Sequence, residues 1–333
     1  MKLNEWYLNN TYDHKQFQVK ELLKLKKKKG LKISLCFPTL NEGKTIGKIL
    51  DIVNKEIYKP GLVDEVVIVD SDSMDRTVDI AREKGFKVFD HSRIFPGLGS
   101  HRGKGEALWK SLFVLEGDII IWCDSDIKNF HPRFIYGLLG PLLLRDDIDF
   151  VKGFYQRPLK MNGSYMKGEG GRVTEIMVRP MLNYHYPQLG KIFQPLSGEY
   201  AGRREVFENI PFFTGYGVES GMLIDIFERF GLDSIAQVNI RRRVHRNQPL
   251  SALSRMSFGI LQAITKKLEF YGKIKVTSRP NKTYNQIDYI NKEYIMAPML
   301  LEEVERPQLI EVREYRSSRK KSPQLEDKQL KAS

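Results

Sequence analysis

Apolar runs alternate with amphipathic segments over the first 126 residues. Continuous apolar residues predict strands, and a helical spacing of apolar positions predicts the helices between them. The predicted strands span residues 33–37, 65–70, 87–89 and 119–123, and the helices span 43–55, 75–84 and 103–115. Near-continuous apolar strands that alternate with helices are typical of a mainly parallel sheet covered on both faces. We therefore predict an α/β fold.

The alternation is less regular after residue 126. We expect helices at 131–144, 172–183, 217–230 and 250–271, and strands at 149–154 and 235–240. Residues 1–30 form an N-terminal extension with a helix at 18–28, which we expect to pack on the main body or on a partner subunit. The polar, basic end from about residue 315 is predicted to be disordered.

Composition restricts the class of protein. The chain has 333 residues, of which 41% are hydrophobic and 29% charged, as is ordinary for a globular protein. We expect neither a transmembrane span, since no apolar run reaches about 18 residues, nor a signal peptide. Cys36 and Cys123 fall inside predicted buried strands, so we expect reduced thiols and a cytoplasmic location. The net charge of +13 favours anionic partners: phosphorylated substrates, nucleic acid or an anionic membrane surface.

The motif Asp124-Ser125-Asp126 directly follows the fourth apolar strand. In open α/β sheets, ligands bind beyond the carboxyl ends of the strands. Two carboxylates there are costly to bring together unless a positive charge lies between them, and hard divalent cations prefer oxygen ligands. The alternative is a simple turn after a strand. The position of the motif favours a cation that carries a nucleotide diphosphate, as in a nucleotide-sugar glycosyltransferase.

Loops after the first two strands carry further candidates. Residues 38–43 place Glu42 where a nucleoside could dock, or they form a strand-to-helix turn capped by Asn41. Residues 70–77 lie beside that loop, so Ser71 or Asp70 could contact the nucleotide; alternatively, Asp75 or Ser73 caps the next helix. Lys104, between two glycines at a predicted helix start, suits a phosphate or is an exposed lysine.

Two later segments suit an anionic substrate. Residues 168–175 combine three glycines with Arg172 and Thr174, which together could grip a phosphate or carboxylate, or form a flexible linker. His245, a candidate metal ligand, lies among the arginines of 241–246. The chain lacks a complete dinucleotide fingerprint, a P-loop and a Cys/His zinc spacing, which disfavours hydride transfer and P-loop chemistry.

Taken together, the motifs resemble one family. The segments PTLNEG, VDSDSMDRT, GKGEALW, DSD, GEGGRVTE, SGEYAGRR, GYGVESG and VHRNQPL occur in the order seen in the glucosyl-3-phosphoglycerate synthases, over about residues 30–275. The resemblance implies a GT-A (Rossmann-like) fold with a C-terminal acceptor-binding lobe. It divides the chain into an N-terminal extension (1–30), a nucleotide-sugar-binding half (31–126), an acceptor-binding and metal-completing half (127–280) and a C-terminal extension (281–333).

The resemblance also assigns site residues. Donor-binding residues would be Pro38, Leu40, Glu42, Ser71, Lys104, Asp124 and Ser125. Acceptor-binding residues would be Gly171, Arg172, Thr174 and Asn247. Asp126 and His245 would ligate Mg²⁺ or Mn²⁺, and the catalytic residues would be Asp126, Lys104 and Glu219. The resemblance further implies a homodimer.

The implied reaction moves glucose from UDP-glucose to the 2-hydroxyl of 3-phosphoglycerate with retention of configuration. Two related transfers remain alternatives: mannosyl transfer to phosphoglycerate, and transfer to a polyprenyl phosphate. The latter usually needs membrane attachment, and we expect no stable membrane insertion. A basic nucleic-acid-binding protein is a distant alternative, because the arginines cluster with acidic residues and not with interleaved aromatics. We therefore expect no nucleic-acid partner.

Overall fold

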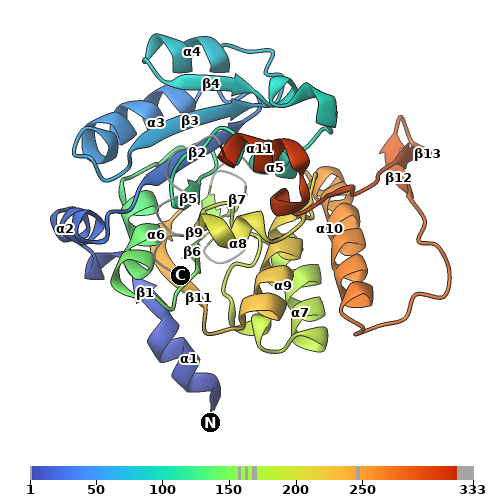
Figure 1. Cartoon of the computed structure of the whole chain (residues 1–333). Helices are drawn as coiled ribbons and strands as arrows, with labels where there is room; N and C mark the ends of the chain where they lie inside the picture. The colour runs from blue at the N-terminus through green and yellow to red at the C-terminus, as the bar shows by residue number, and fades with distance from the viewer. Residues whose placement is uncertain (1, 157–158, 162–163, 167–170, 245–247, 321–333) are drawn as a thin grey trace.

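An eight-stranded sheet forms the centre of the computed structural model, which describes residues 2–156, 159–161, 164–166, 171–244 and 248–320. Figure 1 shows the sheet with helices on its two faces. In spatial order the strands are β1 (Thr11–Asp13), β11 (Ile235–Arg242), β6 (Phe150–Gln156), β9 (Tyr200–Arg203), β5 (Ile119–Trp122), β2 (Ile33–Thr39), β3 (Glu65–Asp70) and β4 (Lys87–Asp90). Neighbours pair in parallel except that β9 runs antiparallel to β5 and β6, so the predicted mainly parallel sheet is confirmed.

Each strand of the core feeds two hydrophobic clusters because successive side chains point to opposite faces. In β5, Ile119 and Ile121 join one cluster, whereas Ile120 and Trp122 join the other. One face is covered by α2 (Val19–Lys29), α3 (Ile46–Val53), α4 (Thr77–Glu83) and α6 (Arg133–Leu144). The opposite face is covered by α5 (Lys104–Ser111), α7 (Arg179–His185), α8 (Arg204–Glu208), α9 (Val218–Phe230) and α10 (Leu250–Phe270).

The N-terminal extension packs on the main body. Helix α1 (Lys2–Asn10) places Trp6 in the core, where its indole N–H donates to the Leu232 carbonyl at 2.9 Å. Strand β1 then pairs with β11 at the edge of the sheet. Its sequence, Thr-Tyr-Asp, carries no apolar run, so the sequence pattern did not predict it. None of the helices described is both long and apolar enough to cross a bilayer.

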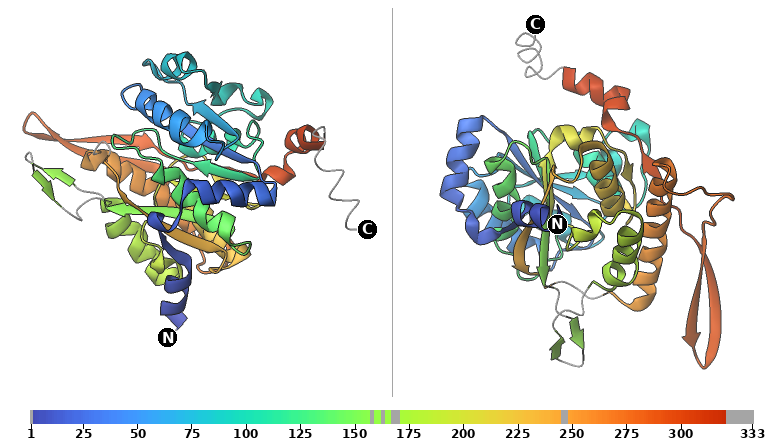
Figure 2. Two further views of the ribbon diagram at one scale, coloured as in Figure 1. Left: turned by 90° about the vertical axis from the view of Figure 1, so that its left-hand side faces the viewer. Right: turned by 90° about the horizontal axis from the view of Figure 1, so that it is seen from below.

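The C-terminal extension contains a projecting hairpin and a short strand. Strands β12 (Thr283–Ile290) and β13 (Glu293–Leu300) form a separate antiparallel ribbon that extends from the body in Figure 2. Outside this extension, a second two-stranded ribbon in the middle of the chain pairs β7 (Leu159–Met161) with β8 (Ser164–Met166). Strand β14 (Glu305–Arg306) returns to the body and pairs with β10 (Phe212–Phe213). The sequence analysis predicted no strand at any of these positions.

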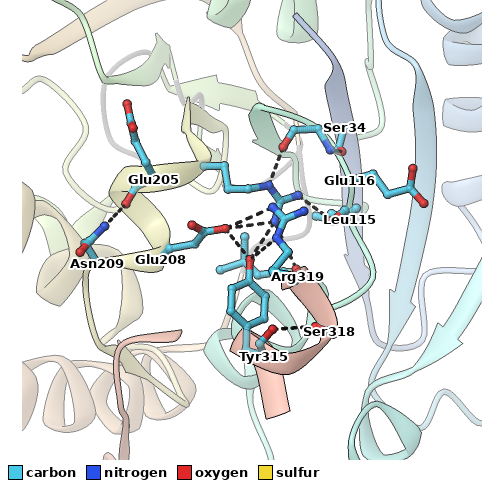
Figure 3. Close-up of polar contacts among 12 residues, drawn as sticks. Ser34, Leu115, Glu116, Glu205, Glu208, Asn209, Tyr315, Ser318 and Arg319 are labelled. Carbon is cyan, nitrogen blue, oxygen red and sulfur yellow. Dashed lines mark hydrogen bonds and ion pairs between the residues drawn. The ribbon is translucent and has the colours of Figure 1, made fainter. Parts of the chain in front are cut away.

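The prediction of disorder from residue 315 is wrong as far as residue 320. Helix α11 spans Arg313–Lys320. Tyr315 is only 3% exposed, and its hydroxyl donates to the Glu208 carboxylate of α8, which Arg319 also contacts at 3.2 Å (Figure 3). The buried Tyr315 and the carboxylate that it shares with Arg319 hold this helix in place despite its basic composition. Residues 321–333 lie outside the described part of the chain.

Candidate active site

The loops predicted to bind the donor meet at one edge of the sheet. Strands β2, β3 and β5 are adjacent and parallel, so their carboxyl ends bring together the segments 38–42, 70–71 and 124–126. The first two loops are joined directly: the Thr39 hydroxyl donates to Asp70 at 2.7 Å, and the Met74 N–H donates to the Asn41 side chain at 2.8 Å. This edge is where open α/β sheets bind ligands.

The predicted donor residues differ in how accessible they are. Leu40 is 43% exposed, and Pro38 and Ser71 are half-buried. Burial, together with the nearby Asp126 carboxylate, raises the pKa of Glu42 to about 7. Ser125 is buried, and its hydroxyl donates to the Pro38 carbonyl at 2.8 Å. The Ser125 side chain therefore fastens the acidic turn to β2, and its contact with a donor stays a prediction.

Lys104 joins two carboxylates from different parts of the chain. Its ammonium lies 2.6 Å from Asp124 Oδ1 and 2.7 Å from Glu219 Oε1. Burial opposes the charge on Lys104, but the coulombic attraction of Asp124 and Glu219 outweighs it and raises the pKa of Lys104 well above 10.5. The predicted catalytic residues Lys104 and Glu219 thus lie in direct contact as a charged pair, next to the acidic motif.

Arg243 is a site residue to which the sequence analysis gave no separate role. One guanidinium nitrogen lies 2.7 Å from Asp124 Oδ2 and 2.6 Å from Asp126 Oδ1, and another lies 2.9 Å from Glu199 Oε1. Arg243 directly follows β11, and Glu199 directly precedes β9. Glu199 falls in the motif SGEYAGRR, which carries the resemblance, and Arg243 directly precedes the motif VHRNQPL; these positions were the available signal.

Lys152, on β6, is a second basic residue beneath the site. Its ammonium lies 4.6 Å from the centroid of the Tyr200 ring and donates to the Ser197 carbonyl at 3.1 Å. Burial lowers the pKa of Lys152 to about 7, although the Glu219 carboxylate acts in the opposite direction. A lysine within a predicted strand is expected to face solvent, so the sequence did not indicate that Lys152 lies in the site.

The site has the chemistry of a divalent-cation site. Among the described residues, the carboxylates of Glu42, Asp124, Asp126, Glu199 and Glu219 gather here around Lys104 and Arg243. Carboxylate oxygens are ligands that suit Mg²⁺ and Mn²⁺. The other predicted metal ligand, His245, lies outside the described residues.

A different group of potential ligands lies on neighbouring loops. Oxygen and nitrogen atoms of Asp72, Asp90 and His91 lie within 4.8 Å of one another. The His91 ring nitrogen Nδ1 is already 3.0 Å from the Asp70 carbonyl. This group is separate from the predicted pair of Asp126 and His245, and its geometry alone assigns it no role.

The predicted acceptor residues begin a helix. Gly171 has a left-handed backbone (φ 86°), and its carbonyl accepts from the Glu175 N–H at 3.0 Å. Thr174 is buried and starts the π-helical turn Thr174–Val178, which leads into α7. Arg172 donates to the Gln248 carbonyl at 2.8 Å, which links this loop to the segment before α10. The remaining acceptor candidate, Asn247, lies outside the described residues.

Comparison with known proteins decides the family. The sequence profile of "Glycosyl transferase family 2" matches residues 34–218, more than half of the chain. A glucosyl-3-phosphoglycerate synthase of Petrotoga mobilis is 49% identical over 311 residues, which cover 93% of this chain and 96% of the relative. The chain belongs to the glucosyl-3-phosphoglycerate synthases of glycosyl transferase family 2. A glucosyl-3-phosphoglycerate synthase of Mycobacterium tuberculosis is 46% identical over 241 residues, covering 71% of this chain and 74% of the relative.

Solved structures agree with this family assignment. A glucosyl-3-phosphoglycerate synthase from Mycobacterium tuberculosis, in complex with Mn²⁺, UDP-glucose and phosphoglyceric acid, superposes with a TM-score of 0.78 at 38% identity, covering 91% of this chain and 99% of that chain. A mannosyl-3-phosphoglycerate synthase from Rubrobacter xylanophilus superposes with a TM-score of 0.87 at 35% identity, covering 93% of this chain and 99% of that chain. The predicted GT-A fold is confirmed by these likenesses.

Proposed function

We propose that this protein transfers glucose from UDP-glucose to the 2-hydroxyl of 3-phosphoglycerate with retention of configuration, in a reaction that depends on Mg²⁺ or Mn²⁺. The observation that carries the proposal is the meeting of Lys104 with Asp124 and Glu219 beside the Asp126 carboxylate, at the strand ends. Support comes also from the relatives named glucosyl-3-phosphoglycerate synthase and from the ligands bound in the Mycobacterium tuberculosis structure.

Each region of the site receives one task in this proposal. The loops at 38–42 and 70–71 hold the uridine, and Asp124 lies on the ribose side. Asp126 and His245 ligate the metal, which when bound stabilises the charge of the departing diphosphate as a Lewis acid. Lys104 adds a positive charge near that diphosphate. Gly171, Arg172, Thr174 and Asn247 bind the phosphate and carboxylate of the acceptor.

Retention is best served by a front-face displacement. Four of the five carboxylates described at the site are engaged by cations: Glu219 by Lys104, and Glu199, Asp124 and Asp126 by Arg243. Such ion pairs lower the nucleophilicity of a carboxylate. In the proposed step the bond between the anomeric carbon and the phosphate oxygen breaks, and a bond to the acceptor hydroxyl oxygen forms on the same face. The departing phosphate oxygen takes the hydroxyl proton. Isolation of a covalent glycosyl-enzyme adduct would contradict this step.

Mannosyl transfer to the same acceptor is the second candidate. The observation that favours it is the TM-score of 0.87 to the mannosyl-3-phosphoglycerate synthase from Rubrobacter xylanophilus. The greater sequence identity to relatives named for glucosyl transfer, 49% and 46%, favours glucose. The two candidates share the acceptor and the metal and differ only in the donor.

A donor–acceptor matrix tests the proposal. UDP-glucose, other nucleoside diphosphate glucoses and a nucleoside diphosphate mannose are each incubated with and without 3-phosphoglycerate, with Mg²⁺, Mn²⁺ or a chelator, and nucleoside diphosphate release is measured. We expect release to require 3-phosphoglycerate and metal and to be fastest with UDP-glucose. Release that is indifferent to the chelator or to the acceptor would contradict the proposal. The variant His245→Ala should weaken the dependence on metal, and near-normal metal dependence would show that the ligand assignment is wrong.

We also propose a cytoplasmic homodimer. The two cysteines, Cys36 and Cys123, are buried and unpaired as thiols, which suits a reducing compartment. The β12–β13 hairpin exposes a row of large apolar side chains: Ile287, Tyr289, Tyr294, Met296 and Leu300. A two-stranded ribbon is marginally stable alone in water, and a second copy of the chain would cover these side chains.

A further inference from the structure

A short C-terminal segment contacts both elements that carry the Lys104–Glu219 pair. Residues 303–306, which we name the C-terminal clasp, follow the β12–β13 hairpin and end in β14. In the β10–β14 pair, Phe212 lies opposite Arg306, and the N–H of Thr214 donates to the Val304 carbonyl at 2.8 Å. The clasp is therefore hydrogen-bonded to the segment that leads into α9.

Glu303 holds the loop before α9. Its two carboxylate oxygens accept from the N–H groups of Gly215 and Tyr216, at 3.1 Å and 2.9 Å. A Cβ atom added to Gly215 would lie 2.4 Å from Glu303 Oε1, and one added to Gly259 would lie 2.6 Å from the same oxygen. The backbone at these two glycines therefore leaves space that the Glu303 carboxylate fills and that a Cβ atom would take. Glu219 lies in the first turn of the helix that this loop begins.

Arg306 holds the start of α5 in the same way. Its guanidinium makes a two-nitrogen contact with the fully buried Glu106, at 2.9 Å and 2.6 Å. It also donates to the carbonyls of Leu98 and Gly99, at 2.8 Å and 3.1 Å, in the loop before α5. Glu106 is two residues from Lys104, so Arg306 fixes both sides of the turn that presents the lysine.

The two held elements touch each other through their backbones. A Cβ atom on Gly103 would lie 2.4 Å from the Thr214 carbonyl oxygen, and one on Gly105 would lie 1.8 Å from the Phe213 carbonyl oxygen. The N–H of Glu106 donates to the Thr214 carbonyl at 2.9 Å. Only glycine permits this approach, which sets Lys104 against Glu219.

We propose that Glu303 and Arg306 are positioning residues of the glucosyl-transfer site, acting through the α9 loop and through Glu106 to hold Lys104 and Glu219 in register. This inference rests on the proposed function, because it takes Lys104 and Glu219 as groups that act in the transfer. A misplacement of about 1 Å at a reacting centre can cost about 100-fold in rate. Loss of the clasp contacts should therefore lower kcat more than it weakens substrate binding.

The variants Glu303→Gln and Arg306→Lys test the role with little change of size. Glutamine can accept only one of the two N–H groups, and lysine keeps the charge but loses the fork that holds Glu106. We expect kcat to fall about 10-fold, with both KM values within about 2-fold of the wild type. The control is Lys55→Ala, which removes an exposed ion pair with Glu56 (3.1 Å) outside the clasp and outside both held elements, so kcat should stay unchanged.

A double variant separates positioning from general destabilisation. If Glu303 acts through Glu219, Glu303→Gln combined with Glu219→Gln should be no slower than Glu219→Gln alone, because coupled residues are not additive. Multiplicative losses, or unchanged kcat in both clasp variants, would overturn the inference. If the wild type fails to use UDP-glucose with 3-phosphoglycerate, the proposed function fails separately. The same variants are then measured with the donor and acceptor that the matrix identifies, so the clasp is judged in either case.

Discussion

Lys104 and Glu219 lie 115 positions apart in the sequence, yet their charged groups are 2.7 Å apart. The pair joins the first residue of α5 to the first turn of α9, and Asp124 contacts the same ammonium. Lys104 therefore lies where the acidic turn after β5 meets the helix of the other half. Its positive charge is held by two carboxylates before any substrate binds.

We predict that Lys104→Met lowers kcat by about 100-fold or more, since it removes a positive charge that stabilises the departing diphosphate. Glu219→Gln should lower kcat by about 10-fold, because Lys104 loses one of its two anchors. The double variant should match Lys104→Met alone, since the residues act as a unit. Steady-state kinetics with saturating donor and acceptor measure all three. Additive losses would show that Glu219 acts independently of Lys104.

Asp126→Asn should abolish most of the activity and leave the fold intact. The side chain is partly exposed at a strand end, and Arg243 keeps its contacts with Asp124 and Glu199. We expect kcat/KM to fall at least about 100-fold, with a melting temperature close to that of the wild type. The exposed carboxylate variant Asp79→Asn serves as control. Substantial remaining activity would argue against Asp126 as a metal ligand.

Arg172→Ala should weaken the acceptor site selectively. A charge-assisted contact with phosphate or carboxylate is worth about 1.5–3 kcal/mol, so KM for 3-phosphoglycerate should rise about 10-fold to 100-fold. KM for UDP-glucose should change less than about 2-fold. The exposed Arg82→Ala is a matched control. Equal rises in both KM values would argue against an acceptor role.

The buried Lys152 makes the free energy of unfolding depend on pH. Its pKa is lowered from 10.5 to about 7 in the folded protein, so between these values the unfolded chain binds more protons. The contribution of Lys152 to the free energy of unfolding therefore rises with pH from about 7 to 10.5. Lys152→Met removes this dependence. The variant should gain about 1–3 kcal/mol over the wild type near pH 6, and the gain should shrink as pH increases.

Urea unfolding of both proteins at several pH values measures this difference. The exposed Lys44→Met should follow the wild-type pH dependence. A gain that is constant with pH would show that Lys152 is charged in the folded protein throughout this range.

The exposed apolar side chains of the β12–β13 hairpin lead us to predict that the protein is a dimer in solution. Tyr294 is 80% exposed and packs against Tyr289, with ring centroids 4.9 Å apart. If a second copy covers the ribbon, Tyr294→Glu should convert a dimer into a monomer, as measured by light scattering on a sizing column. Met74→Glu changes an apolar residue elsewhere that is 91% exposed, and it should leave the dimer intact. A monomeric wild type would contradict the proposal.

Local patterns predicted the strands β2, β3 and β5 and the turns that follow them well. Strands β2, β3 and β5 are continuous apolar runs. The acidic turn follows β5, and Lys104 is the first residue of α5. The meeting of these strand ends at one edge followed from the parallel order alone. The contact of Lys104 with Asp124 was not predicted, although α5 leads directly into β5 and therefore begins at the edge where β5 ends.

Contacts between distant segments could not be predicted in this way. The pairing of Arg243 with Glu199 depends on β9, a four-residue strand whose direction nothing local reveals. Arg306 reaches Glu106 across 200 positions, and its surroundings carry no periodic pattern. Residue 315 lies in a basic run typical of disorder, and only the docking of Tyr315 on α8 decides otherwise.

The reversed direction of β9 gives the chain a separate place to vary. Because β6 ends and β9 begins at the same edge of the sheet, the excursion between the two strands starts and finishes at that edge and does not change the order of the central strands. Insertions or exchanges in this excursion would reshape the acceptor side while the threading of the central strands stays the same. Three of the four proposed acceptor residues, Gly171, Arg172 and Thr174, lie in this excursion, so a change of acceptor can arise there while the proposed donor loops stay unaltered.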